Sequence, residues 1–180
     1  RRSDRALRRV LWTAAILALN LIFQSSVLPF FKIRGIIPNT ALVIIISFSL
    51  LRGSFEGCLT GFGAGLLQDI FFGNSLGYYA LLGTLTGYLC GKFNHGFFRE
   101  NYATPVILSA VAAIVYETAV YITGFLFAGN LHYLHFLLNL ILPEAVYTAI
   151  VTFVIYRILF SINDHIENKD KYKRKLFTIK

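Results

Sequence analysis

The sequence predicts an all-α integral membrane protein, a bundle of six transmembrane helices, on three observations. Hydrophobic residues make up 56% of the 180 residues and charged residues only 14%, with a mean hydropathy of +0.63. Soluble domains average about 45–50% apolar and about 25% charged residues. Two runs, Val10–Phe31 and Thr118–Pro143, hold no charged residue, and about 18 such residues are enough for a membrane span. The basic residues, finally, gather at the two ends of the chain.

The first two predicted spans follow the basic N-terminal segment. The first covers residues 10–31, and we expect it to be retained because it has no clear small-residue cleavage site of a signal peptide. The second covers residues 37–51 and begins with Pro38, in a position suited to a helix start. A helix rises roughly 1.5 Å per residue and the hydrocarbon core is about 30 Å thick, so the second span is short.

The third and fourth spans, residues 57–72 and 76–91, form a hairpin that is rich in glycine. Glycine recurs every four residues in both, as Gly57, Gly61 and Gly65 and as Gly83, Gly87 and Gly91. This spacing gives each helix a smooth stripe, along which helix backbones can approach closely. The stripes predict close packing, either between these two spans or with the helix of a partner protein.

Carboxyl groups occur inside the third span and inside the fifth and sixth, which cover residues 103–128 and 135–160. These groups, Asp69, Glu117 and Glu144, have no Lys or Arg in a span core to match them. Ionised carboxylates are costly in a membrane and normally face the bundle interior, a partner or water. Three roles stay open: protonated carboxyls hydrogen-bonded between helices, a proton or cation relay, and a contact with a partner.

Two further expectations concern the surroundings of these acids. Asp69 is predicted near the outer end of its span, where Lys32 or Arg34 of the first outer loop could pair with it. Pro143 precedes Glu144, and its ring should kink the last span by freeing the carbonyl of the residue four positions earlier.

Charge between the spans favours the six-span count. With the N-terminus in the cytoplasm, every one of the 17 Lys and Arg residues except Lys32 and Arg34 falls on the cytoplasmic side, which is the positive-inside pattern. The short second to fourth spans leave an alternative of four full spans and one hairpin. We predict one membrane domain of residues 1–160 and a basic cytoplasmic tail of residues 161–180. Basic ends on an apolar body suit anionic lipid better than nucleic acid.

Motifs of catalysis and metal binding are missing from the sequence. It has no HExxH, GxSxG, P-loop or CxxC pattern. His132 and His135 are three residues apart but have no third ligand nearby in the chain, and Cys58 and Cys90 lack metal-ligand spacing. We therefore predict a protein that is not an enzyme and that holds no metal or cofactor.

The middle of the chain carries a recognisable pattern. It runs through Pro38-Asn39-Thr40-Ala41-Leu42, Leu51-Arg52-Gly53, the glycine run that ends in Leu66-Leu67-Gln68-Asp69, Leu76-Gly77 and Gly87-Tyr88. This pattern resembles the rod shape-determining MreD family, and the size, basic ends and six apolar segments agree with it. The chain departs from the family pattern at Asn39, where an acid is expected.

The resemblance implies a non-enzymatic component of the bacterial elongation machinery in the plasma membrane, which regulates cell shape and side-wall peptidoglycan synthesis. The implied partners are the bitopic protein MreC, the actin-like MreB, and the RodA glycosyltransferase with its class B penicillin-binding protein. In this interpretation the glycine-lined faces admit a transmembrane helix of MreC, and Asp69 fixes the outer end of the hairpin.

An alternative function comes from a second likeness. The MreD family is similar in fold to the substrate-binding subunits of energy-coupling-factor transporters, which would make the chain a vitamin-binding membrane subunit. Ala14 and Ala18, four residues apart in the first span, resemble the small-residue spacing by which such subunits dock on their membrane partner.

Overall fold

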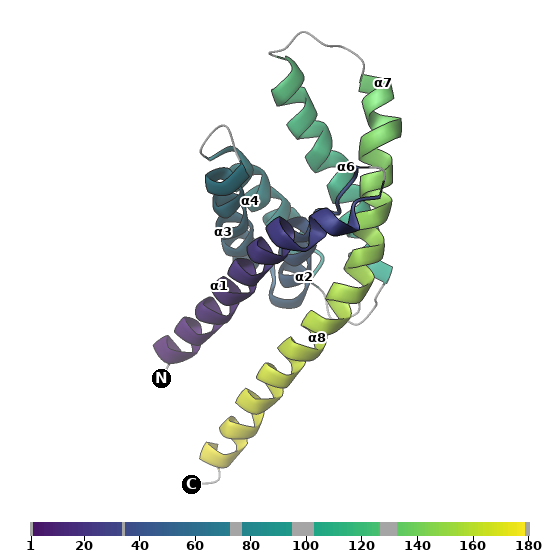
Figure 1. Cartoon of the computed structure of the whole chain (residues 1–180). Helices are drawn as coiled ribbons and strands as arrows, with labels where there is room; N and C mark the ends of the chain where they lie inside the picture. The colour runs from purple at the N-terminus through teal and green to yellow at the C-terminus, as the bar shows by residue number, and fades with distance from the viewer. Residues whose placement is uncertain (1, 34, 73–76, 95–102, 127–132, 179–180) are drawn as a thin grey trace.

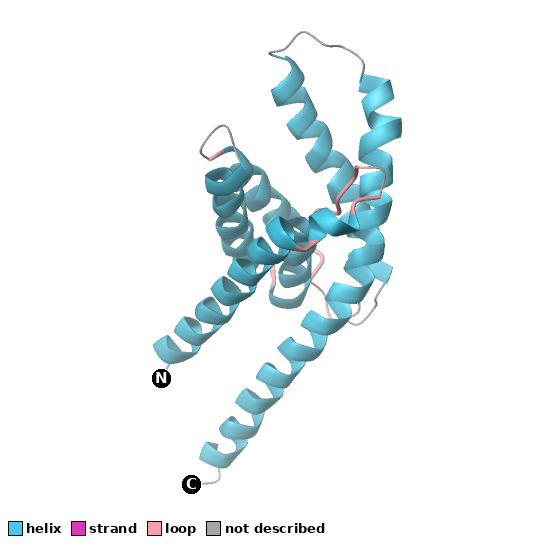
Figure 2. Cartoon of the chain, in the orientation of Figure 1, coloured by secondary structure: helices cyan, strands magenta, loops and turns pink. Residues whose placement is uncertain are grey.

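A computed structural model gives the fold and describes residues 2–33, 35–72, 77–94, 103–126 and 133–178. Within these ranges the chain is helical and holds no strand beyond an isolated bridge between Ile33 and Ile36 (Figure 2). In chain order the elements are α1 (Arg2–Ser26), the 3-10 turn η1 (Leu28–Phe31), α2 (Thr40–Arg52), α3 (Ser54–Phe72), α4 (Tyr78–Gly91), α6 (Ala103–Leu126), α7 (Tyr133–Phe136), the π-helical segment η2 (Leu137–Ile141) and α8 (Leu142–Thr178). The all-α fold class is therefore confirmed for the described residues, and each predicted span contains helix.

Helix α2 lies at the centre of the molecule and contacts α1, α3, α4, α6 and α8 (Figure 1). Every residue from Thr40 to Leu51 is buried, which explains why the helix is apolar on all sides. It begins later than the predicted residues 37–51, because the Asn39 side chain accepts the Leu42 N–H and caps the first turn. With 13 residues, α2 is about 20 Å long.

Hydroxyl groups within the helices bond to their own backbone. Ser47 and Ser49 donate to the carbonyls of Val43 and Ile45 at 2.7 and 2.6 Å. The same bond to the carbonyl four residues earlier occurs at Thr60, Thr84, Thr86 and Thr152. Such bonds satisfy a hydroxyl group without water, as the interior of a membrane requires.

The C-terminal third of the chain forms a long helical rod beside α6. Elements α7, η2 and α8 follow one another without interruption up to Thr178. The distortion expected before Pro143 takes the form of the π-helical segment, in which the Leu142 N–H donates to the Leu137 carbonyl. Proline lacks an N–H and crowds the preceding turn, and a π-bulge absorbs that irregularity within a continuous helix.

Two helical stretches are long and apolar enough to cross a membrane, Ala103–Thr123 and Leu134–Asn163. Val10–Ser26 and Thr40–Arg52 are shorter apolar helices, and a crossing by α1 to α4 stays a prediction. Large apolar side chains such as Phe55, Leu81 and Val146 are more than half exposed on the outside of the bundle. Extensive exposed apolar surface suits lipid or a partner protein better than water.

The two ends of the chain lie at the same end of the molecule (Figure 1). Helix α1 and the last turns of α8 both extend from the bundle in that direction. The fold thus brings the basic N-terminal segment and the basic tail, which are far apart in sequence, to one side.

Candidate functional site

The two glycine stripes face each other inside the α3–α4 hairpin. A Cβ atom placed on Gly61 would overlap the carbonyl group of Gly83, and one on Gly87 would overlap that of Gly57. At the ends of the hairpin, Gly65 lies against the backbone of Tyr79 and Ala80, and Gly91 lies against that of Ser54. The backbones are in direct contact, so the six glycines pack one helix of the chain against another. In this structure they leave no room on the stripe for the helix of a partner.

Asp69, near the end of α3, binds the start of α4 and so holds together the end of the hairpin at which Gly65 lies. Its buried carboxylate accepts the backbone N–H groups of Gly77, Tyr79 and Ala80 at 2.9, 2.9 and 3.1 Å. These are N–H groups at the start of α4, which have no partner within the helix and carry its positive dipole end. Asp69 thus caps α4 from α3. The structure gives it no ion pair with Lys32, and Arg34 lies outside the described residues.

A polar cluster joins α2, α6 and α8 near the start of α2. The Asn39 amide group donates to Glu117 Oε1 at 3.4 Å, and the Asn39 backbone N–H donates to Thr148 Oγ1 at 3.2 Å. The carboxyl groups of Glu117 and Glu144 lie close enough to each other to interact. Carboxyls hydrogen-bonded between helices, a relay and a partner contact at Glu117 and Glu144 all stay predictions.

Tyrosine side chains surround this cluster on the side of α3 and α4. The Tyr116 hydroxyl donates to Gln68 Oε1 at 3.0 Å, and the Tyr116 ring stacks on Tyr79 with centroids 6.3 Å apart. The Tyr78 hydroxyl donates to the carbonyl of Ala119 at 2.9 Å. These contacts connect the glycine hairpin to α6.

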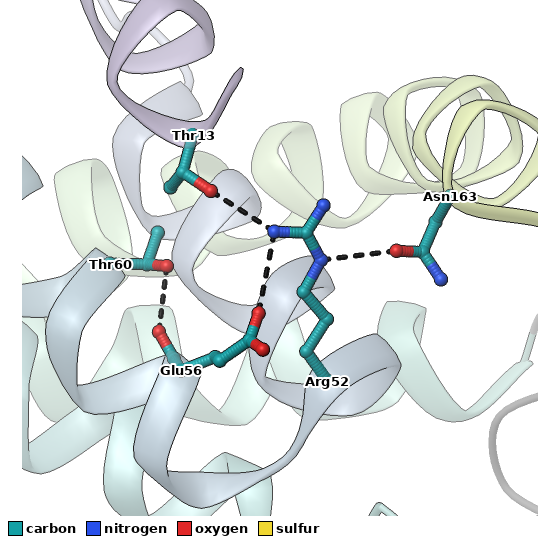
Figure 3. Close-up of polar contacts among 5 residues, drawn as sticks. All are labelled: Thr13, Arg52, Glu56, Thr60 and Asn163. Carbon is teal, nitrogen blue, oxygen red and sulfur yellow. Dashed lines mark hydrogen bonds and ion pairs between the residues drawn. The ribbon is translucent and has the colours of Figure 1, made fainter. Parts of the chain in front are cut away.

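Arg52, the last residue of α2, forms a second polar centre with side chains of α1, α3 and α8 (Figure 3). Its Nε donates to Asn163 Oδ1 at 3.0 Å, and its Nη1 donates to Thr13 Oγ1 at 3.1 Å and to Glu56 Oε2 at 3.4 Å. The guanidinium carbon also lies 4.5 Å from the centre of the Phe48 ring. One side chain that is 8% exposed therefore joins α1, α2, α3 and α8.

Sequence reasoning did not find this role of Arg52 or the contact of Asn39. Arg52 stood out only as a loop charge and as part of the Leu51-Arg52-Gly53 pattern, and Asn39 only as a departure from an expected acid. The available signal was a single cation between two apolar segments, followed by an acid four residues later, a spacing that brings side chains together on a helix. Their distant partners could not be read from spacing.

The described residues contain no group of three or more His, Cys, Asp or Glu side chains placed to hold a metal ion. Cys58 and Cys90 are free, and Cys90 is buried. His132 lies outside the described residues, so the pair that it forms with His135 in the sequence is not placed.

Comparison with protein families gives one match, to the model described as rod shape-determining protein MreD, over residues 4–163. The chain belongs to the MreD family. This match includes the glycine hairpin, the acids Asp69, Glu117 and Glu144, and Arg52, and it confirms the resemblance carried by the Pro38–Gly91 pattern. Searches of curated proteins and of solved structures give no significant match.

Membership of the MreD family implies a role in determining rod shape. It places the chain among membrane proteins that act as structural components of the rod-shape machinery with other Mre proteins, a family not known for enzymatic activity. The polar groups described above agree with such a role, since they connect helices: Asp69 joins α3 to α4, Asn39 joins α2 to α6 and α8, and Arg52 joins four helices.

Proposed function

We propose that this chain is a non-enzymatic membrane scaffold of the bacterial elongation machinery and that it acts by binding MreC. In this proposal six helices cross the plasma membrane, both termini are cytoplasmic, and MreB, RodA and a class B penicillin-binding protein are reached through MreC or directly. The observation that carries it is the family match over residues 4–163. The arrangement of both chain ends on one side of the bundle supports the topology.

The mechanism is one of binding to a rigid surface. The glycine stripes are filled by each other, so we place the MreC helix on the outside of the bundle instead of between α3 and α4. The closely packed hairpin then serves to keep neighbouring helices in fixed positions. A bundle fixed in this way presents the same outer surface to every partner molecule, which favours specific association at low entropic cost.

Depletion of the protein in a rod-shaped host, followed by microscopy, tests the function. The scaffold predicts rounded, swollen cells, because side-wall synthesis loses its spatial control. Rods of normal shape that require an added vitamin for growth would contradict the scaffold and support the transporter alternative.

Photo-crosslinking tests the binding of MreC directly. A crosslinking residue is placed at one exposed position on each of four helices, namely Leu19 of α1, Leu85 of α4, Val111 of α6 and Ile150 of α8. Covalent capture of MreC should occur from one helix or from two neighbouring ones. Ile46, which is fully buried in α2, is the matched position that should give no product. Absence of MreC from all four exposed positions would contradict the proposed contact.

A further inference from the structure

Arg157 lies on the outward face of α8 and is exposed. Three neighbours on that face are apolar and exposed, with Phe153, Val154 and Ile158 each at least half accessible, and the polar Ser161, one turn further on, is exposed as well. The opposite face of the helix, which includes Tyr156 and Thr152, is fully buried against the bundle. Arg157 is thus a cation within a surface that otherwise suits lipid.

No carboxylate of the chain neutralises this cation among the residues that the structure describes. Arg157 makes no hydrogen bond, ion pair or ring contact with them. It is also the one charged residue of the sequence between Ala145 and Asn163. It falls inside the stretch Leu134–Asn163, which is long and apolar enough to cross a membrane. A cation that lacks a partner among the described residues is costly at such a place unless its charge reaches the membrane–water interface or finds an anion.

Arg157 lies close enough to the expected end of the membrane span for its side chain to reach the membrane–water interface. Asn163, which bonds Arg52 at the end of the bundle near the termini, lies six residues further along the helix, a rise of about 9 Å. Trp12 and Phe55, both more than half exposed, lie beside the residues that contact Arg52, as expected of aromatic side chains at a membrane boundary. A long arginine side chain can extend from this depth to the headgroup layer while its stem stays in hydrocarbon.

We propose that Arg157 binds the phosphate of a phospholipid in the leaflet next to the chain termini, and that it makes the protein prefer anionic lipid there. The planar guanidinium group can donate two parallel hydrogen bonds to phosphate oxygens. Arg2, Arg5, Arg8 and Arg9 of α1 are brought to the same end of the bundle by the fold, which raises the local concentration of anionic lipid. This inference rests on the membrane placement in the proposed function but does not depend on MreC.

The test uses the purified full chain in nanodiscs of phosphatidylcholine alone and of an equal mixture with phosphatidylglycerol. Native mass spectrometry counts the two lipids that remain bound, and thermal melts record stability in each disc. Arg157→Gln should lower the preference for phosphatidylglycerol about fivefold, the effect of one cation close to an anionic surface. Arg157→Lys should keep part of the preference, since a point charge remains without the bidentate geometry.

Lys173→Gln is the matched control, because it also removes one positive charge but lies ten residues beyond Asn163 on α8, outside the span. It should keep the wild-type preference. An equal loss in Lys173→Gln would overturn the proposal, since the effect would then belong to the overall charge of the basic end. A preference unchanged in Arg157→Gln would overturn it as well.

A third arm distinguishes lipid from free anion. Inorganic phosphate added to discs of phosphatidylcholine alone should leave the melt of the wild-type chain unchanged. A stabilisation by phosphate that Arg157→Gln removes would overturn the assignment to lipid. Arg157 is exposed, so all variants should fold, which equal melts in phosphatidylcholine would verify. None of these outcomes depends on MreC binding or cell shape.

Discussion

Asp69 shows how a single buried carboxylate can be fully satisfied by backbone groups. Three backbone N–H groups of the α4 start converge on its two oxygens. The first turn of a helix leaves such groups without a partner, and in an apolar medium an unpaired N–H costs several kcal/mol. A carboxylate supplies both the acceptors and the negative charge that the helix dipole favours.

Replacing this carboxylate should therefore destabilise the protein by an amount that follows the number of acceptors lost. We expect Asp69→Ala to lower the free energy of unfolding by about 2 kcal/mol or more, and Asp69→Asn by roughly half as much. The measurement is unfolding in mixed micelles, followed by circular dichroism. Equal stability of Asp69→Ala and wild type would show that the capping bonds contribute nothing.

Asn39 has two separable roles, a cap for α2 and a hydrogen-bond donor to Glu117. Asn39→Asp keeps the cap, because aspartate and asparagine cap helices about equally well. It removes the N–H donor and sets a third carboxyl group against Glu117 and Glu144. We expect a loss of about 1–3 kcal/mol of stability from the unsatisfied acceptor and the crowded acids.

Glu117→Gln in the Asn39→Asp background supplies the control for this effect. The glutamine amide can donate to the new carboxylate, so the double variant should recover most of the lost stability. The comparison of single and double variants gives the coupling energy between the two positions. Additive losses would show that the two side chains do not interact.

At the scale of helices, the α3–α4 hairpin depends on positions where even one methyl group cannot fit. Gly61 contacts the backbone of Gly83, whereas a Cβ atom placed on Gly63 of the same helix would meet only the end of the Leu17 side chain, 3.4 Å from its Cδ1. The two glycines are two residues apart and lie on different sides of α3. They form a matched pair for the same substitution.

Gly61→Ala should destabilise the protein by about 1–3 kcal/mol or more, because the backbones of α3 and α4 would have to separate. Gly63→Ala should be neutral or stabilise by up to about 1 kcal/mol, since alanine favours the helix more than glycine does. Thermal melts in detergent compare the two variants with wild type. Equal effects at both positions would contradict the backbone contact between the stripes.

At the scale of the whole molecule, Arg52 connects the peripheral helix to the bundle. In α1 the apolar side chain of Leu17 is buried, while Leu11, Trp12 and Leu19 are more than half exposed. Helix α1 therefore has little packing of its own. The bond from Arg52 to Thr13 joins it to α2, and through Asn163 to α8.

Arg52→Lys should loosen α1 more than the rest of the protein. Lysine keeps the charge but cannot reach Thr13, Glu56 and Asn163 together, because it lacks the planar fork of donors. We expect a loss of about 1–3 kcal/mol and faster amide hydrogen exchange in α1 than in α2. Lys92→Ala, which removes an exposed cation that lies over the Tyr88 ring, should leave the exchange of α1 unchanged. Unchanged α1 exchange in Arg52→Lys would contradict the connecting role.

The sequence by itself determined the helical class, because long uncharged runs leave a chain few ways to satisfy its backbone in an apolar medium. It also identified the glycine stripes and the acids, since spacing of four places residues on one helix face. Periodicity alone could not tell whether a stripe meets its neighbour or a partner. It also could not predict the late start of α2, which depends on the Asn39 cap.

Only the tertiary structure decided the partners of the polar groups. Asn39 and Glu117 are 78 residues apart in the chain, and Arg52 and Asn163 are 111 apart, so no local rule connects them. The acid expected to need a cation, Asp69, has backbone N–H groups instead. Local sequence patterns identify the polar side chains that require a hydrogen-bond or ion-pair partner. The packing of helices that are distant in the sequence determines which group is that partner.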